Sequence, residues 1–199
     1  MLQTRHAPAA DELALAPGVA LARARAHEAA GPARAVFALL AAARLSGPVL
    51  WLQAGRAGER LLGDGIRAFV DPARLVFARA RKPAEALWAA EEALRTAEVP
   101  LVVADLDAPP ELTAVRRLHL AAEAGALRGG TAPLALLLTP GSGGAPGIET
   151  RWRLAPAPGW GGASASGRWQ LSRSRARMAP ERTWEAWLED GRLQLAPAT

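Results

Sequence analysis

Short apolar segments alternate with alanine-rich stretches over the first 140 residues, and this alternation limits the folds open to the chain. Four segments are predicted as buried strands: 49–53 (VLWLQ), 75–78 (LVFA), 101–106 (LVVADL) and 134–138 (LALLL). Three stretches between them are predicted as helices: 33–45, 84–97 and 112–127. Strands that alternate with helices form βαβ crossovers, which predicts an α/β fold with a mostly parallel sheet flanked by helices.

The two ends of the chain depart from this pattern. The start is polar and rich in proline and alanine, which predicts a flexible N-terminal segment at 1–18 and a single domain at 19–199. Residues 19–26 (VALARARA) are predicted as a strand, and residues 27–32 as a loop. After the Gly/Pro-rich loop at 140–147, three strand-like segments predict antiparallel strands that complete the sheet: 151–154, 168–177 and 193–195.

Composition excludes several kinds of chemistry. The chain has no cysteine, so disulfides, thiolate catalysis and iron–sulfur clusters are ruled out. His6, His27 and His119 are scattered without metal-ligand spacing, so neither a metal nor another cofactor is expected. The longest uninterrupted apolar run, residues 35–43, is too short to span a bilayer, and no signal peptide is evident. A cytoplasmic protein without membrane association is expected.

The excess of positive charge is local. Residues 151–182 contain seven arginines against Glu181 alone, although the whole chain has a net charge of only +5. Within this region, a strand over 168–177 would place five side chains on one face: Trp169, Leu171, Arg173, Arg175 and Arg177. Such a stripe suits a phosphate backbone or an acidic partner. The alternative is a solvated edge strand whose charges prevent aggregation.

Two tryptophans near the C-terminus form a second candidate contact. On a helix, Trp184 and Trp187 would share a face and could anchor a partner. Core packing is the alternative use of these side chains.

The first loop between a strand and a helix is the usual phosphate site of an α/β domain. Here that loop contains one glycine, Gly31, and it lacks the lysine and the Ser/Thr hydroxyl of a working phosphate loop. Arg34, at the start of the helix, could meet an anion. Asp105 ends the strand at 101–106, where it either binds magnesium or caps the following loop. Conventional nucleotide hydrolysis is not expected, and no catalytic residue is predicted.

The order and spacing of four segments resemble the core of the RecA recombinases. The segments are 27–53 (HEAAGPARAVFALLAAARLSGPVLWLQ), 75–106 (LVFARARKPAEALWAAEEALRTAEVPLVVADL), 116–140 (RRLHLAAEAGALRGGTAPLALLLTP) and 167–183 (GRWQLSRSRARMAPERT). The degenerate phosphate loop and the short length are similar to those of the ImuA proteins. These are RecA-like accessory factors of a damage-inducible mutagenesis cassette, sometimes labelled SulA-like.

The resemblance implies a RecA-like core with a degenerate phosphate loop at Gly31 and Arg34, and Asp105 at the Walker B position. ATP dependence does not carry over, because the lysine and hydroxyl positions are lost. The short loop at 140–147 replaces a longer DNA-binding loop, which argues against strand exchange. A basic pair that reaches a neighbouring protomer's nucleotide in recombinases matches either Arg173 with Arg175 or Arg175 with Arg177.

The function implied by the resemblance is that of a non-catalytic adaptor in damage-induced, error-prone translesion synthesis. Its expected partners are an ImuB-type inactive Y-family polymerase homologue and a C-family error-prone polymerase. Contact with RecA, self-association and direct DNA contact stay open. Two alternatives compete with the adaptor: a RecA-like ATPase with an unconventional site at Arg34 and Asp105, and a SulA-type inhibitor of cell division.

Overall fold

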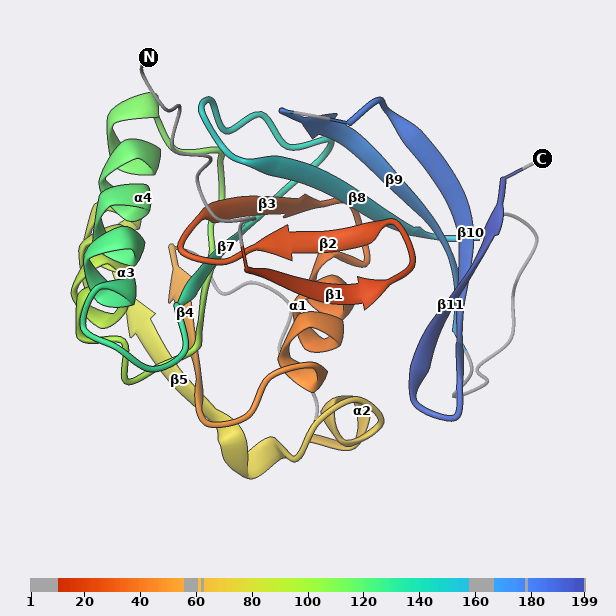
Figure 1. The fold of residues 1–199 in the computed structure, drawn as a ribbon, viewed down its shortest axis with the longest axis horizontal. Coiled ribbons are helices and arrows are strands. Elements are labelled where there is room, and N and C mark those ends of the chain that lie inside the picture. Colours follow the sequence, from red (N-terminus) through yellow and green to blue (C-terminus); the bar gives the residue numbers. More distant parts are fainter. Residues whose placement is uncertain (1–10, 56–60, 62, 158–166, 178, 199) are drawn as a thin grey trace, which may run out of the picture.

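A computed structural model describes residues 11–55, 61, 63–157, 167–177 and 179–198 (Figure 1). Eleven strands occur within these residues: β1 (Glu12–Ala16), β2 (Val19–Ala22), β3 (Ala26–Ala30), β4 (Val49–Ala54), β5 (Leu75–Ala80), β6 (Leu101–Asp105), β7 (Leu134–Thr139), β8 (Thr150–Pro156), β9 (Arg168–Ala176), β10 (Arg182–Glu189) and β11 (Arg192–Pro197). The helices of the same residues are α1 (Arg34–Ala43), α2 (Gly63–Arg67), α3 (Pro83–Thr96), α4 (Leu112–Ala126) and the short 3₁₀ helix η1 (Pro72–Arg74).

One large sheet organises the described part of the chain. Its strand order is β11-β10-β9-β8-β3-β7-β6-β4-β5, and β1 and β2 form a separate antiparallel hairpin. The strands β8, β3, β7, β6, β4 and β5 are parallel to one another. From β8 the sheet continues through β9, β10 and β11, each antiparallel to the strand before it. The predicted mixed α/β class, with antiparallel strands at the C-terminal end, is confirmed.

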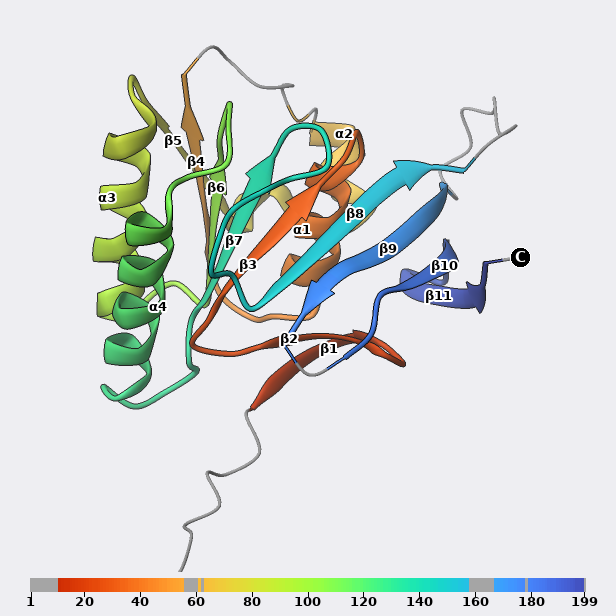
Figure 2. The ribbon, with the colours of Figure 1, turned by 90° about the horizontal axis from the view of Figure 1, so that it is seen from above.

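Helices cover both faces of the parallel part of the sheet. Figure 2 shows α1 on one face and α3 with α4 on the other. The apolar runs of β4, β6 and β7 are buried because they face helices on both sides: Val103 packs in the cluster under α1, and Val102 in the cluster under α3 and α4. Among the described helices, none combines the length and the apolar character needed to cross a membrane.

The central strand β3 differs from the prediction. A strand was expected at 19–26 and a loop at 27–32, but β2 ends at Ala22 and a new strand occupies 26–30. The polar pair His27–Glu28 suggests a loop, yet both side chains are fully buried in β3. His27 Nδ1 lies 2.6 Å from Thr150 Oγ1, and its Nε2 lies 2.9 Å from the Ala22 carbonyl oxygen. Buried polar groups are tolerated when their hydrogen bonds are satisfied, as they are here.

Glu28 connects β3 to the loop that follows β7. Its carboxylate accepts hydrogen bonds from Thr139 Oγ1 at 2.6 Å and from the Gly144 amide at 2.9 Å. It also pairs with the Arg151 guanidinium at 2.5 Å on the neighbouring strand β8. The loop predicted at 140–147 is therefore tied to the sheet through one buried carboxylate.

The N-terminal hairpin also differs from the prediction. Residues 12–16 form β1, although 1–18 was expected to be flexible; residues 1–10 lie outside the described part of the chain. Leu13 and Leu15 alternate with exposed or half-buried neighbours and are only 4% and 6% exposed. They pack with the cluster under α1, so this apolar alternation holds β1 against the domain.

Candidate functional site

Arg34 and Asp105, predicted as the remnants of a nucleotide site, lie together at the carboxyl end of the parallel strands. Arg34 is the first residue of α1, and Asp105 is the last residue of β6. Arg34 Nε lies 3.6 Å from Asp105 Oδ1, and the two side chains are 20% and 11% exposed. The cation beside Asp105 is thus supplied by the chain's own arginine. Because both groups are largely shielded from solvent, their attraction is stronger than that of a surface pair.

Gly31 occupies the turn between β3 and α1 for a reason of packing. Its φ is +91°, and a Cβ at this position would lie 2.5 Å from the Leu154 carbonyl oxygen of β8. The turn can therefore approach β8 only with glycine at this position.

The amides of this turn are used within the protein. The Ala33 amide donates to the Leu154 carbonyl at 3.0 Å, and the Arg34 amide donates to the Gly31 carbonyl at 3.2 Å. Pro32 has no amide hydrogen to donate. A phosphate loop instead directs successive free amides at an anion. Among the described residues, no group of three or more His, Asp or Glu side chains is placed to hold a metal ion.

The arginine stripe predicted on β9 is divided by an irregularity in the pairing of β8 with β9. Trp152 pairs with Arg173, but the preceding residue Arg151 pairs with Arg175, so Ser174 has no partner in the register. This bulge places Arg173 on the face that carries α1 and Arg175 on the opposite face. The prediction that Trp169, Leu171, Arg173, Arg175 and Arg177 share one face is therefore wrong beyond Arg173.

Arg173 is held in place by contacts within the molecule. Its guanidinium lies 5.7 Å from the ring centroid of Trp152 and 5.5 Å from that of Trp184. It donates hydrogen bonds to the carbonyl oxygens of Gly18 at 3.2 Å and of Pro180 at 3.1 Å. Arg173 thereby links the β1–β2 hairpin to the large sheet. Arg177 lies beyond β9, with its Nε 3.6 Å from Glu149 Oε2.

The two C-terminal tryptophans belong to a strand rather than a helix. Trp184 and Trp187 lie on β10, where an odd spacing puts them on opposite faces. Trp184 is 3% exposed, and its ring centroid lies 6.2 Å from that of Trp152 in a tilted arrangement, in agreement with the core-packing alternative. Trp187 lies on the other face, with the Arg168 guanidinium 5.9 Å from its ring centroid.

One edge of the sheet carries apolar side chains that the sequence pattern places in the interior. Residues 75–78 were predicted as a buried strand, but β5 is the last strand of the sheet. Val76 is 53% exposed and Phe77 is 48% exposed. The signal that distinguishes this edge is Arg79 within β5 and Arg81 just after it, since β4, β6 and β7 contain no arginine.

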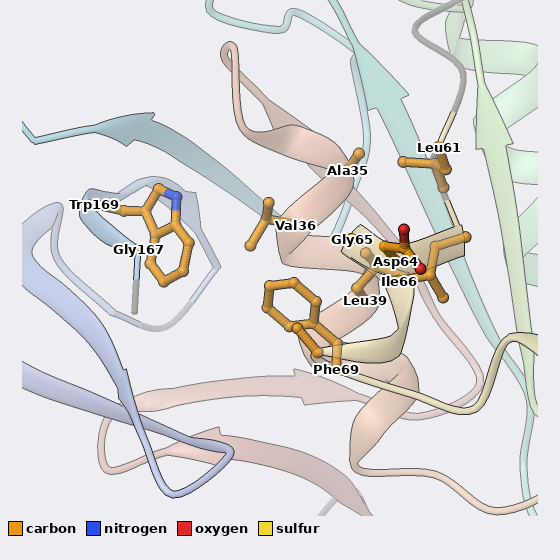
Figure 3. Close-up of a pocket in the computed structure, with 11 residues that line it drawn as sticks. Ala35, Val36, Leu39, Leu61, Asp64, Gly65, Ile66, Phe69, Gly167 and Trp169 are labelled. Carbon is orange, nitrogen blue, oxygen red and sulfur yellow. The ribbon is translucent and has the colours of Figure 1, made fainter. Parts of the chain in front are cut away.

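An apolar pocket lies between α1, α2 and the start of β9 (Figure 3). Its volume is about 380 Å³, and Val36, Phe69 and Trp169 are among the side chains that line it. Asp64 is the one charged side chain among its described lining residues. The pocket suits an apolar group, and its described lining residues include no pair of polar groups of the kind that acid–base catalysis requires.

Comparison with known proteins finds similar sequences. No family model matches the chain. The chain is 41% identical to the Protein ImuA of Caulobacter vibrioides strain NA1000 / CB15N over 125 residues, which cover 58% of this chain and 48% of that protein. Protein ImuA of the strain ATCC 19089 / CIP 103742 / CB 15 gives the same identity and coverage. The chain spans about half the length of these curated relatives. Over the matched residues the chain is similar to Protein ImuA, in agreement with the resemblance found in its sequence.

Proposed function

We propose that the chain is a non-catalytic adaptor in damage-induced, error-prone translesion DNA synthesis. The proposal rests on the contacts at the edge of the sheet where a RecA-like ATPase would bind nucleotide. There Arg34 lies beside Asp105, and the amides of Ala33 and Arg34 donate to carbonyl oxygens. The similarity to Protein ImuA supports the mutagenesis setting.

A RecA-like core is part of this proposal. The turn at Gly31 follows β3, and Asp105 ends β6, two strands away across β7 in the same parallel sheet. The residues assigned to the phosphate loop and to the Walker B position thus share one edge, as a RecA-like arrangement requires.

An adaptor needs an exposed surface, and the β5 edge provides one. Its main chain pairs with β4 on one side, and Val76 and Phe77 are exposed to solvent. At the opposite edge, β11 contains Pro197, starts with Arg192 and lies against β1, three features that discourage strand addition. We assign the β5 edge to an extended apolar segment of the ImuB-type partner, which would add to the sheet as a further strand. A C-family polymerase, RecA or a second copy of the chain are the competing occupants.

The β5 assignment is tested by capture of a purified ImuB-type protein on the tagged chain. The double variant Val76→Lys plus Phe77→Lys should lose at least 10-fold in captured partner, because two charges would be buried against an apolar segment. Leu120→Lys plus Leu127→Lys is the matched control, since these side chains are 64% and 89% exposed, on α4 and at its C-terminal end, away from β5. Equal capture by the wild type and by the double variant, with unchanged melting temperatures, would refute the β5 assignment.

The ATPase alternative is decided by calorimetric titration with Mg-ATP. The adaptor proposal predicts no saturable heat of binding up to about 1 mM nucleotide, a limit that corresponds to about 4 kcal/mol of binding free energy. Micromolar binding that disappears in Asp105→Ala would overturn the proposal in favour of an ATPase. Filamentous cells on overexpression, in a strain without the polymerase cassette, would instead favour the division inhibitor.

A further inference from the structure

We propose that the face of β8, β9 and β10 opposite to α1 binds single-stranded nucleic acid. Figure 2 shows α3 and α4 over the strands from β5 to β3, whereas β9 and β10 extend beyond these helices. Arg153, Arg168, Arg175 and Trp187 belong to this surface, here called the β8–β10 face. It is independent of the β5 edge, which lies at the other end of the sheet.

The pairing register places these side chains in order. Arg153 pairs with Ser172, and Ser172 with Thr183, so one row across the strands carries a guanidinium and two hydroxyls. A second row pairs Arg168 with Trp187, four residues along β9 from Ser172 and about 13 Å away. Gln170 and Glu185 pair between these two rows, so the surface of β9 and β10 is mainly polar and carries the ring of Trp187.

The bulge in β9 adds the third arginine to this face. Because Arg175 pairs with Arg151, its side chain lies on the same side of the sheet as Arg153 and Arg168. Arg168 and Arg175 are both exposed, and seven residues of strand correspond to about 20 Å. This length matches a short stretch of single strand, the site size found on other sheet surfaces that bind single strands.

The charges of these arginines are available to a ligand. Among the ion pairs formed by the described residues, none involves Arg153, Arg168 or Arg175. Arg151 is on the same face, but its charge is balanced by Glu28. Glu185, which pairs with Gln170, is the acidic side chain in the middle of the face. Glu189 lies on the same face at the end of β10, opposite Arg192 of β11, so the three guanidiniums and the one central carboxylate of Glu185 leave the centre of the face positive.

The half-buried ring of Trp187 favours a single-stranded nucleic acid over an acidic peptide. A nucleobase can stack on an indole, and arginine planes recognise phosphates, so one ligand satisfies both groups. Bases of a duplex are already stacked on each other and offer no free face to an aromatic side chain. Single-stranded nucleic acid therefore fits both the charge and the aromatic group.

The test is fluorescence anisotropy of a labelled 20-nucleotide oligo-dT titrated with the full chain at 50 mM salt. Micromolar binding is expected, with weaker binding to the matched duplex and a loss of affinity as salt rises. Arg168→Glu plus Arg175→Glu should weaken binding at least 10-fold, and Trp187→Leu about 5-fold. Oligo-rU distinguishes an RNA ligand from a DNA ligand.

The matched control is Arg81→Glu plus Arg128→Glu, which changes the net charge equally at exposed positions outside the β8–β10 face. This control should bind oligo-dT within 2-fold of the wild type. An equal loss in the control would overturn the site, since only the total charge would matter. The site is likewise overturned if oligo-dT does not bind, or if polyglutamate competes as well as unlabelled oligo-dT. The β5 variant Val76→Lys plus Phe77→Lys should keep oligo-dT binding, so this proposal and the adaptor proposal fail separately.

Discussion

Gly31 has a packing role in the turn between β3 and α1. A glycine in the first strand–helix turn of an α/β domain commonly lets a phosphate approach the main chain. In this molecule the space beside Gly31 is filled by the Leu154 carbonyl of β8. Glycine is therefore required so that the turn between β3 and α1 can contact β8.

A substitution at Gly31 should therefore affect stability. We expect Gly31→Ala to lower the free energy of unfolding by about 3 kcal/mol, because a Cβ clash adds to a strained φ. Gly129→Ala is the control: its φ is also positive, at +87°, but no atom lies within 4 Å of its added Cβ. It should cost about 1 kcal/mol. If urea denaturation shows that both variants lose the same free energy of unfolding, the close approach of Gly31 to β8 does not contribute to stability.

At the scale of the element, the bulge in β9 decides which arginines are structural. Arg173 should stabilise the fold through its hydrogen bonds to Gly18 and Pro180 and its contacts with two tryptophans. We expect Arg173→Ala to cost about 2 kcal/mol. Arg175→Ala should change the free energy of unfolding by less than about 0.5 kcal/mol. Thermal denaturation of the two variants checks this, and a melting temperature that falls equally in both would contradict the division between faces.

The elements that could be predicted from the sequence are those whose burial is uniform. The apolar runs that form β4, β6 and β7 are continuous, and their helices end at Gly or Pro signals. The strand β3 was missed because AHEAA contains two polar residues, and only the partners supplied by β8 and by the loop after β7 make their burial tolerable. The strand β10 was missed because a three-residue spacing of tryptophans is also typical of a helix.

The candidate site was predictable in part for the same reason. Arg34 and Asp105 were identified because element boundaries place them at the carboxyl ends of strands. The position of Arg175 could not be predicted, because a bulge reverses the alternation of faces and leaves no mark in the residue pattern. The exposure of Phe77 depends on strand order, which the local sequence does not contain.

For the whole molecule, the buried His27 makes stability depend on pH. Burial lowers the pKa of His27 from 6.5 to about 4, although its hydrogen bond to the Ala22 carbonyl opposes the shift. The unfolded chain therefore binds a proton between about pH 6.5 and pH 4 that the folded chain does not bind. The contribution of His27 to the free energy of unfolding is complete above pH 6.5. It falls by about 3 kcal/mol in all as the pH drops through this window.

This dependence can be measured by urea denaturation at pH 7 and pH 5. We expect the wild type to lose about 2 kcal/mol more between these values than His27→Gln, whose amide does not titrate. The lowered pKa of His119, also caused mainly by burial, contributes equally to both proteins. Parallel pH profiles for the wild type and His27→Gln would show that the imidazole does not set this dependence.

The place of β3 in the sheet has a consequence for the nascent chain. Both strands that flank it, β7 and β8, are encoded more than 100 residues later. The middle of the sheet can therefore form only when most of the polypeptide has left the ribosome. Until then the side chains of His27 and Glu28 are exposed to water. A protein organised in this way folds slowly for its size and exposes its first helix to other chains during synthesis, so its yield in the cell should depend on chaperones.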